Sequence, residues 1–328
     1  MYWTGYKSMV ESRGIGQSES GAISIMRILA MFSIIVCHLL QAYNNRYCWL
    51  FNIGVWVFLA ISGYLYGCKV IEDWGHWFKT RFKKLYIPYI LFLLACIPFY
   101  YIFVPEKISV SQIIVHVVDL QGIVGNGIVG LSHLWFMSII ALCYLATPIL
   151  QYLRRFSMVL YIFTILSLMN FFVFKIEVSV FSCFFVYALC YLWGQTSRKK
   201  NLILSLIVAL FGGSLATISW NEILDYENSK NQLFHAVSAL LFVEMGILYS
   251  KFFDCSFRNK WLKAVDHNSY EVYITHHIFI LGPFSLMAFS PFSWMNVVWV
   301  LTLVNSDCCC LAESVFEIEQ IHAYITFM

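Results

Sequence analysis

Long apolar stretches recur along the chain from residue 22 almost to its end. A helix that crosses the hydrocarbon core of a bilayer, about 30 Å thick, needs about 20 mainly apolar residues, since each residue rises about 1.5 Å. Nothing here alternates as a barrel strand would, and lipid offers no partner for open backbone, so these stretches must be helices. The pattern predicts an all-α integral membrane bundle of about ten transmembrane helices. They are expected at residues 22–40, 50–68, 85–104, 133–153, 157–174, 178–195, 201–220, 233–252, 270–290 and 294–312.

Polar residues form no block large enough to fold separately. Of the 328 residues, 60% are hydrophobic and 12% charged, against about 45–50% and about 25% in ordinary globular domains. We therefore expect one transmembrane domain at residues 22–312, between a cytoplasmic N-terminal segment (1–21) and a cytoplasmic C-terminal tail (313–328). The first stretch is not followed by a cleavage site and is expected to remain in the protein.

The basic residues of the connecting segments indicate the orientation. Cytoplasmic loops are enriched in Lys and Arg, and an inside N-terminus places sixteen of these residues inside and four outside. The inside residues are Lys7, Arg13, Lys69, Lys79, Arg81, Lys83, Lys84, Arg154, Arg155, Arg198, Lys199, Lys200, Lys251, Arg258, Lys260 and Lys263; the outside residues are Arg46, Lys107, Lys175 and Lys230. Both termini are thus predicted to be cytoplasmic. The net charge is only +3 and forms no single patch, which argues against nucleic acid as a partner.

The longest connection, residues 105–132, holds an apolar piece at 113–120 that is too short to span, followed by four glycines. Glycines let a backbone approach a ligand closely. Two interpretations stay open for this linker: a segment that lies in the interface or re-enters the membrane, and a flexible surface loop.

Cysteines are not expected to form a disulfide framework. Nearly all of the eleven lie inside apolar stretches, where a thiol packs as a small hydrophobic group. The run Cys308–Cys310 has no Cys or His at ligand spacing, so no metal site is predicted.

Ionised groups inside the predicted spans are few, and each costs at least about 2.5–3.5 kcal/mol on insertion scales, which makes it a functional candidate. Arg27 and His38 share one face of the first span, about 16 Å apart along its axis. Arg27 is either a phosphate-binding fork or a snorkelling helix anchor. His38 is either a general base near neutral pH or a hydrogen-bonded interfacial residue.

Further polar residues extend this pattern. His133 begins the fourth span and is expected to face the same outer cavity as His38. His276 and His277 lie at the start of the ninth span; as chain neighbours, they are expected not to point at one pocket. Glu244 lies in the middle of the eighth span, as a proton relay or as a packing hydrogen bond.

A basic run with Arg81, Lys83 and Lys84 precedes the third span. It is either an ordinary positive-inside anchor or a site for a phosphorylated cytoplasmic donor.

Five sequence segments together resemble motifs of the acyltransferase-3 family of integral membrane acyltransferases. This family includes O-acetyltransferases of bacterial surface polysaccharides and glycolipids. Arg27 and His38 have the family's ten-residue separation, and Gly54 to Leu65 resembles its second-helix Ser-Gly motif, with Ala60 where many members have Leu. The run from Arg81 to Pro88 resembles the basic motif that ends in proline. His133-Leu134-Trp135-Phe136 and the segment from Ser269 to His276 resemble two further family elements. The resemblance covers residues 20 to 310 and implies ten core helices.

The resemblance implies an acyltransferase of the inner (plasma) membrane without a bound cofactor. The expected donor is acetyl-coenzyme A or another acyl-coenzyme A, and the expected acceptor is a hydroxyl of a membrane-linked or exported glycan. His38 is expected to act as general base or transient acyl acceptor, with His133 and His276 as further catalytic residues. Arg27, Arg81, Lys83, Lys84 and Ser62 are expected to hold the donor. The alternatives are a transporter or flippase for a glycolipid or small anion, in which the same residues line a path, and a non-catalytic scaffold. The absence of a clear internal repeat argues against a transporter.

The charge asymmetry predicts that tags at both termini are accessible only from the cytoplasm, whereas the 221–232 loop is labelled from outside. Protease protection of the tags and labelling of an introduced cysteine with an impermeant reagent measure this. External labelling of a cysteine in the loop at 198–200 would contradict the predicted orientation.

Overall fold

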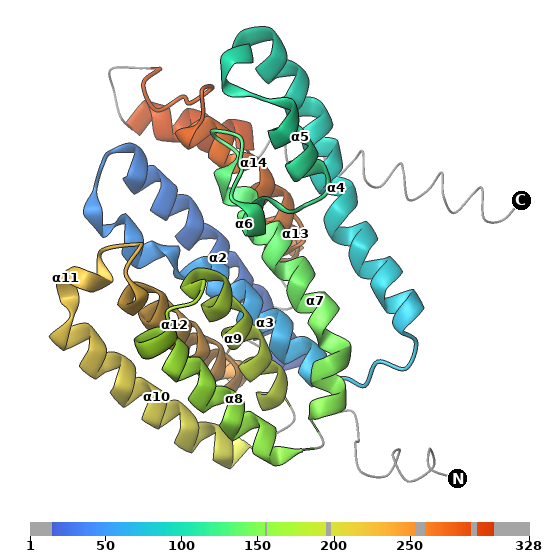
Figure 1. Ribbon diagram of the computed structural model, residues 1–328, viewed down its shortest axis with the longest axis vertical. Helices are drawn as coiled ribbons and strands as arrows, with labels where there is room; N and C mark the ends of the chain where they lie inside the picture. Colours follow the sequence, from blue (N-terminus) through green and yellow to red (C-terminus); the bar gives the residue numbers. More distant parts are fainter. Residues whose placement is uncertain (1–14, 155, 195–197, 253–259, 290–293, 305–328) are drawn as a thin grey trace, which may run out of the picture. The chain divides into compact units, whose positions relative to one another are not determined.

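The computed structural model describes residues 15–154, 156–194, 198–252, 260–289 and 294–304 (Figure 1). Within these ranges every regular element is helical, so the all-α fold class is confirmed. The chain divides into two compact units that alternate along the sequence. Unit 1 comprises residues 1–34, 49–74 and 140–266, and unit 2 comprises residues 35–48, 75–139 and 267–328.

Five helical stretches in the described part of the chain are long and apolar enough to cross a membrane. They are Gln17–Ala42, Arg46–Gly67, Trp74–Phe103, Ser132–Leu153 and Ser229–Leu248. Shorter apolar helices lie at Ile162–Phe174, Val178–Trp193, Leu206–Ile218 and Trp294–Val304. The count of ten spans and the cytoplasmic termini remain predictions. The run Cys308–Cys310 and the C-terminal tail lie outside the described residues.

The helices of unit 1 have the following bounds. Helix α2 (Gln17–Ala42) belongs to unit 1 up to residue 34, and η1 (Arg46–Ile53) belongs to it from residue 49. The other helices of unit 1 are α3 (Gly54–Gly67), α7 (Trp135–Leu153) from residue 140, α8 (Ser157–Met169), the π-helical turn η4 (Asn170–Phe174), α9 (Val178–Trp193), α10 (Arg198–Ile218), α11 (Trp220–Ile223), α12 (Ser229–Leu248) and α13 (Lys260–His267) up to residue 266.

Unit 2 contains the remaining helices and the long linker. Its elements are the end of α2, α4 (Trp74–Phe103) from residue 75, η2 (Pro105–Lys107), α5 (Val110–Val117), α6 (Gln121–Val124), η3 (Ser132–Leu134), the first turn of α7, and α14 (Ser269–Leu281).

Two predicted spans differ from the observed helices by more than five residues at one end. The third predicted span began at residue 85, but α4 begins at Trp74 and includes the basic run, whose Lys and Arg residues are good helix formers. The ninth was predicted to reach residue 290, but α14 ends at Leu281. Gly282 is extended, as expected for a residue that precedes a proline, here Pro283.

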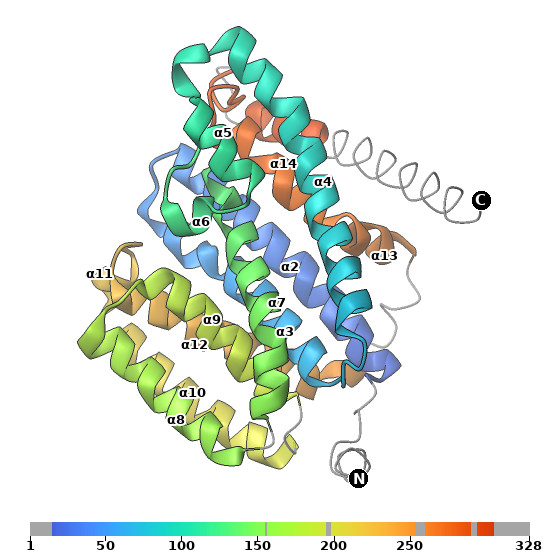
Figure 2. The ribbon, with the colours of Figure 1, turned by 45° about the vertical axis from the view of Figure 1, so that its right-hand side comes forward.

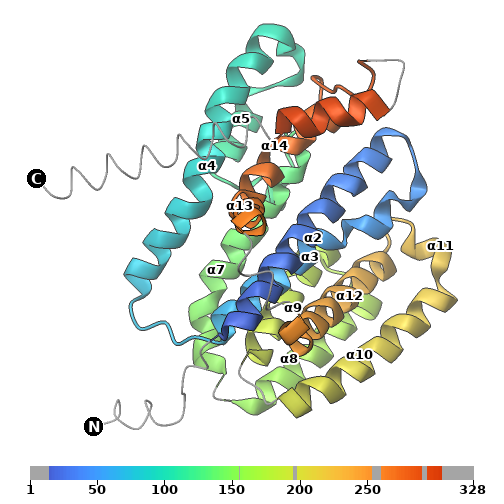
Figure 3. The same ribbon diagram turned by 180° about the vertical axis from the view of Figure 1, so that it is seen from behind.

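Unit 1 is built on a close contact between α3 and α9 (Figure 3). Gly63 and Gly67 stand four residues apart on α3, so they lie on one face of the helix. A side-chain carbon at Gly63 would lie 2.2 Å from the carbonyl oxygen of Tyr187, and one at Gly67 would lie 2.1 Å from that of Tyr191. Small residues at this spacing let two membrane helices approach backbone to backbone. Helix α12 packs on both α3 and α9, and α10 packs on α12.

Polar side chains connect the same helices. The indole nitrogen of Trp56 donates to Ser182 Oγ at 3.1 Å, and the hydroxyls of Thr147 and Tyr187 are hydrogen-bonded at 2.7 Å. All of these atoms are buried. Because lipid supplies no alternative partner, such pairs stabilise one arrangement of the helices.

In unit 2, the linker is folded onto α4 and α7 (Figure 2). The hydroxyl of Tyr89 donates to the carbonyl of His116 at 2.7 Å, and Nε2 of the buried His116 accepts from the amide of Ile128 at 3.0 Å. Burial lowers the pKa of His116 to about 4, so the ring stays neutral and can accept this bond. Gln121 Nε2 donates to the carbonyl of Leu134 at 2.7 Å. The linker is therefore a folded segment, and the interpretation as a flexible surface loop is wrong.

The close α3–α9 contact predicts that Gly63→Ala lowers the free energy of unfolding by about 1–3 kcal/mol, because the added carbon forces the two backbones apart. The apparent melting temperature in detergent or nanodiscs measures this. Gly213→Ala on α10 is the matched control, since nothing lies within 4 Å of the added carbon there. Equal melting temperatures for the two variants would contradict the close contact.

Candidate active site

Four histidine rings from three segments of unit 2 form one cluster. His38 comes from the end of α2, His133 from η3, and His276 and His277 from α14. The ring centres of His38 and His277 are 4.5 Å apart and those of His38 and His276 are 5.2 Å apart. His133 stacks on His277 at 4.5 Å and lies 5.3 Å from His276. The three histidines expected to be catalytic are thus brought together.

The participation of His277 corrects the expectation that two neighbouring histidines cannot point at one pocket. The rings of His276 and His277 are 6.1 Å apart and nearly perpendicular, at 86°. Successive helical residues differ by about 100° in direction, and a ring is long enough for both to reach a partner between them. His38 lies within ring-contact distance of both.

Each of the four rings gives one N–H to an oxygen of unit 2. His133 Nε2 donates to the carbonyl of Ile274 at 2.9 Å, and His276 Nδ1 donates to that of Tyr273 at 2.8 Å. His277 Nδ1 donates to the carbonyl of Gly130 at 2.8 Å. The donor of His38 is Nδ1, which contacts Gln41 Oε1 at 2.6 Å. A neutral imidazole has one donor and one acceptor nitrogen, so the second nitrogen of each ring carries a lone pair.

The four rings differ in exposure. His133, His276 and His277 are at most 4% exposed, whereas His38 is half-buried. Two lone-pair nitrogens, His133 Nδ1 and His276 Nε2, are buried and have no hydrogen-bond partner among the described residues. His38 is therefore the ring that a substrate can reach first, and the other three lie behind it.

Backbone geometry holds the cluster in place. Gly130 has φ +86°, and a side-chain carbon there would lie 2.7 Å from both Gly282 Cα and the Tyr100 hydroxyl. Only glycine therefore fits where the Gly130 carbonyl meets His277. The hydroxyl of Tyr273 donates to the carbonyl of His133, which ties α14 to η3 a second time.

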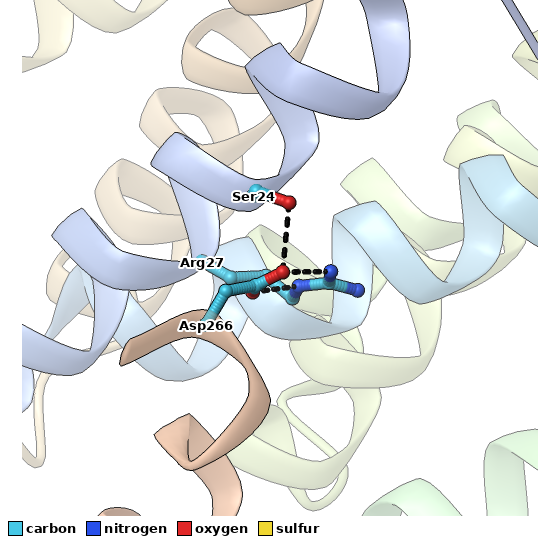
Figure 4. Close-up of polar contacts among 3 residues, drawn as sticks. All are labelled: Ser24, Arg27 and Asp266. Atoms are coloured by element: carbon cyan, nitrogen blue, oxygen red, sulfur yellow. Dashed lines mark hydrogen bonds and ion pairs between the residues drawn. The ribbon is translucent and has the colours of Figure 1, made fainter. Parts of the chain in front are cut away.

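Arg27 is paired with a carboxylate in unit 1 (Figure 4). Its Nε donates to Asp266 Oδ1 at 2.7 Å and its Nη2 donates to Oδ2 at 2.6 Å, while Ser24 donates to the same Oδ2 at 2.7 Å. This joins α2 to α13. The guanidinium has five N–H groups, so its Nη1 side can take a second acceptor while Asp266 holds the Nε side. Its expected role in donor binding remains a prediction.

The other residues expected at the donor lie on two helices. Arg81, Lys83 and Lys84 stand in the first half of α4, where Arg81 and Lys83 are half-buried and Lys84 is exposed. Ser62 is half-buried on α3, one residue before the close-contact glycine Gly63. Their roles at the donor remain predictions.

No group of three or more His, Cys, Asp or Glu side chains in the described part of the chain is arranged to hold a metal ion. Glu244 is 6% exposed on α12, and its role as relay or packing group stays open.

Comparison with known proteins identifies the family of the chain. A family model described as an acyltransferase domain, that of the acyltransferase-3 family, matches residues 20–305. The chain belongs to the acyltransferase-3 family. No curated protein and no solved structure matches it. As a family member with apolar helices of spanning length, the chain is a membrane acyltransferase, and all four clustered histidines lie within the matched region.

Three contacts of this acyltransferase-3 chain were missed from the sequence. Gln41 stands three residues after His38, a spacing at which helical side chains meet, so it could have been found. His277 was expected not to share a pocket with its neighbour His276. Asp266 lies 239 residues from Arg27, and no local pattern connects the two.

A carboxyl in the linker predicts a pH dependence of stability in this acyltransferase-3 protein. Asp119 has φ +54° and accepts from Gln121 Nε2 at 3.1 Å and Ser138 Oγ at 3.2 Å. Burial nevertheless raises the pKa of Asp119 to about 7, while these two hydrogen bonds lower it less. In the unfolded chain its pKa is about 3.9. The stability from this group is therefore complete below about pH 4 and is lost as pH rises towards about 7.

Asp119→Asn should remove this loss, because Asn mimics the neutral acid and tolerates the left-handed backbone. Between pH 5 and pH 8, the apparent melting temperature should fall less in the variant than in the wild type. The same change at the exposed Asp225 is the control. Parallel curves for wild type and Asp119→Asn would contradict the raised pKa.

Proposed function

We propose that this protein moves an acyl group, acetyl above all, from acyl-coenzyme A to a hydroxyl of a cell-envelope glycan or glycolipid in the inner (plasma) membrane. The observation that carries the proposal is the cluster of four imidazoles in which only His38 is partly exposed. An accessible ring with a free lone pair is suited to take a proton from a hydroxyl.

The chemistry follows from one basic nitrogen. His38 Nε2 takes the proton of the acceptor hydroxyl while the hydroxyl oxygen attacks the thioester carbon. The carbon–sulfur bond then breaks, and the proton passes from His38 to the departing thiolate. The products are the acyl ester and free coenzyme A, so that atoms and charges balance.

The buried rings of His133 and His276 are assigned a supporting role in this step. His133 and His276 give their N–H groups to backbone carbonyls and keep a lone pair. A lone-pair nitrogen accepts hydrogen bonds from hydroxyl or amide donors. The reacting hydroxyl gives its single proton to His38, so we assign His133 and His276 to accepting hydrogen bonds from other hydroxyls of the acceptor, which is a positioning role beside the proton transfer.

The donor side is assigned to cationic groups. The diphosphate of coenzyme A suits guanidinium and ammonium groups, which form charge-assisted hydrogen bonds. Arg27 would bind through the side that Asp266 leaves open, with Arg81, Lys83, Lys84 and Ser62 as further contacts. No bound cofactor is required, because coenzyme A enters and leaves as a co-substrate.

His38→Ala should abolish transfer of label from ¹⁴C-acetyl-coenzyme A to a panel of free and lipid-linked oligosaccharides, since a general base contributes typically 10²–10⁴-fold to the rate. The protein should remain folded. His76→Ala, at an exposed histidine on α4, should keep full activity. A folded His38→Ala variant with near-normal transfer would remove His38 from the mechanism. Glycolipid transport without label transfer by the wild type would favour a flippase.

Arg27 offers a test that separates donor binding from helix packing. If its guanidinium holds a phosphate, Arg27→Ala should weaken donor binding roughly 10–150-fold, since a charge-assisted hydrogen bond contributes about 1.5–3 kcal/mol. Arg81→Ala should behave alike. Asp266→Asn removes the countercharge but keeps Arg27, so it should lower thermal stability without weakening donor binding. Calorimetry on purified variants measures this, and equal affinity in wild type, Arg27→Ala and Arg81→Ala would end the donor assignment.

A further inference from the structure

One of the four clustered histidines is oriented differently from the rest. His133, His276 and His277 donate to main-chain carbonyls, which no substitution removes. His38 donates to a side chain, the amide oxygen of Gln41, at 2.6 Å. The ring that substrate reaches is thus the only one whose partner depends on the identity of a side chain.

The contact decides which nitrogen of His38 carries the proton. An amide oxygen can only accept a hydrogen bond, so Nδ1 must be the donor in this pair. The remaining nitrogen, Nε2, then keeps its lone pair. A histidine acts as base or nucleophile through its unprotonated nitrogen, and the hydrogen bond of the other nitrogen selects that atom.

Local structure explains why the pair forms. His38 and Gln41 stand three residues apart in the last turns of α2, where their side chains are neighbours. Both side chains are half-buried, so water competes less for the amide oxygen than it would at an exposed surface. Two buried imidazoles, His276 and His277, border the same ring and limit its rotation.

We propose that Gln41 is a positioning residue that fixes His38 as the Nδ1–H tautomer and so presents Nε2 to the acceptor hydroxyl. This inference rests on the proposed acyl transfer. It holds whether His38 acts as general base or as transient acyl acceptor, because both roles use the lone pair of Nε2. The role resembles that of the carboxylate that orients the histidine in a Ser-His-Asp triad.

Two substitutions distinguish the effect of the Gln41 amide oxygen on kcat from the effect of side-chain size. Gln41→Met keeps the length of the side chain but has no oxygen, whereas Gln41→Glu keeps an oxygen that accepts. With the best acceptor of the oligosaccharide panel, Gln41→Met should lower kcat roughly 10²-fold, within the range of a lost base. The KM for acetyl-coenzyme A should change less than about twofold, since donor binding lies with other residues. Gln41→Glu should recover most of kcat.

A matched control is the same chemical change at Gln112. That glutamine caps α5 by bonding Ser109 and Gly127, outside the histidine cluster. Gln112→Met should leave kcat unchanged. Comparable melting temperatures for Gln41→Met and Gln41→Glu show that any difference in kcat is not a loss of folding.

A spectroscopic measurement tests the tautomer of His38 independently of any activity assay. In protein with ¹⁵N-labelled histidine in nanodiscs, His38 is identified by the signal that His38→Asn removes. The wild type and Gln41→Glu should show a protonated Nδ1, and Gln41→Met should show loss of this single tautomer. An unprotonated Nδ1 in the wild type, or an unchanged kcat in Gln41→Met, overturns the inference. If the wild type transfers no acyl group but shows the Nδ1–H tautomer, the proposed function fails while the tautomer assignment stands.

Discussion

A buried polar group has no water to complete its hydrogen bonds, and the arrangement of unit 2 follows from this constraint. A neutral imidazole must place one N–H on some oxygen. Four imidazoles meet in one place, and their oxygen partners come from three segments: a side chain on α2, a glycine carbonyl in the linker, and two carbonyls of α14. Two of these bonds, from His133 to Ile274 and from His277 to Gly130, also join separate segments, so the candidate site and the fold of this unit depend on the same contacts.

The two units satisfy the constraint in different ways. In unit 1, glycines on α3 bring two backbones together, and few polar side chains are needed between them. Unit 2 contains a folded linker with short helices, whose open backbone groups require many partners. Tyr89, His116 and Gln121 supply these partners from side chains. The candidate site contains polar groups, and it lies in the unit whose side chains already satisfy such groups.

Sequence reasoning found the elements that depend on local pattern. Apolar length gave the helices, and motif spacing gave His38, His133 and His276, which the structure brings together. The prediction from hydropathy that a helix continues through residues 282–289 was wrong. Hydropathy measures only how apolar a segment is, and a glycine followed by a proline ends the helix here. The expectation for His277 was wrong because the two neighbouring rings of His276 and His277 both lie within ring-contact distance of His38. The roles of these residues, the donor and the acceptor do not follow from pattern or from fold.

The pair of Arg27 and Asp266 has a consequence for biosynthesis. The two residues are 239 positions apart, so α2 leaves the ribosome long before its counter-ion is made. Until then the guanidinium, ten residues after the start of α2 at Gln17, lacks its carboxylate and must reach along the helix towards the lipid headgroups. Once α13 is synthesised, the carboxylate of Asp266 can bind the guanidinium of Arg27 in place of the headgroups. The last part of unit 1 to be synthesised thus completes the first, and a chain truncated before residue 266 would keep α2 with an unmatched charge.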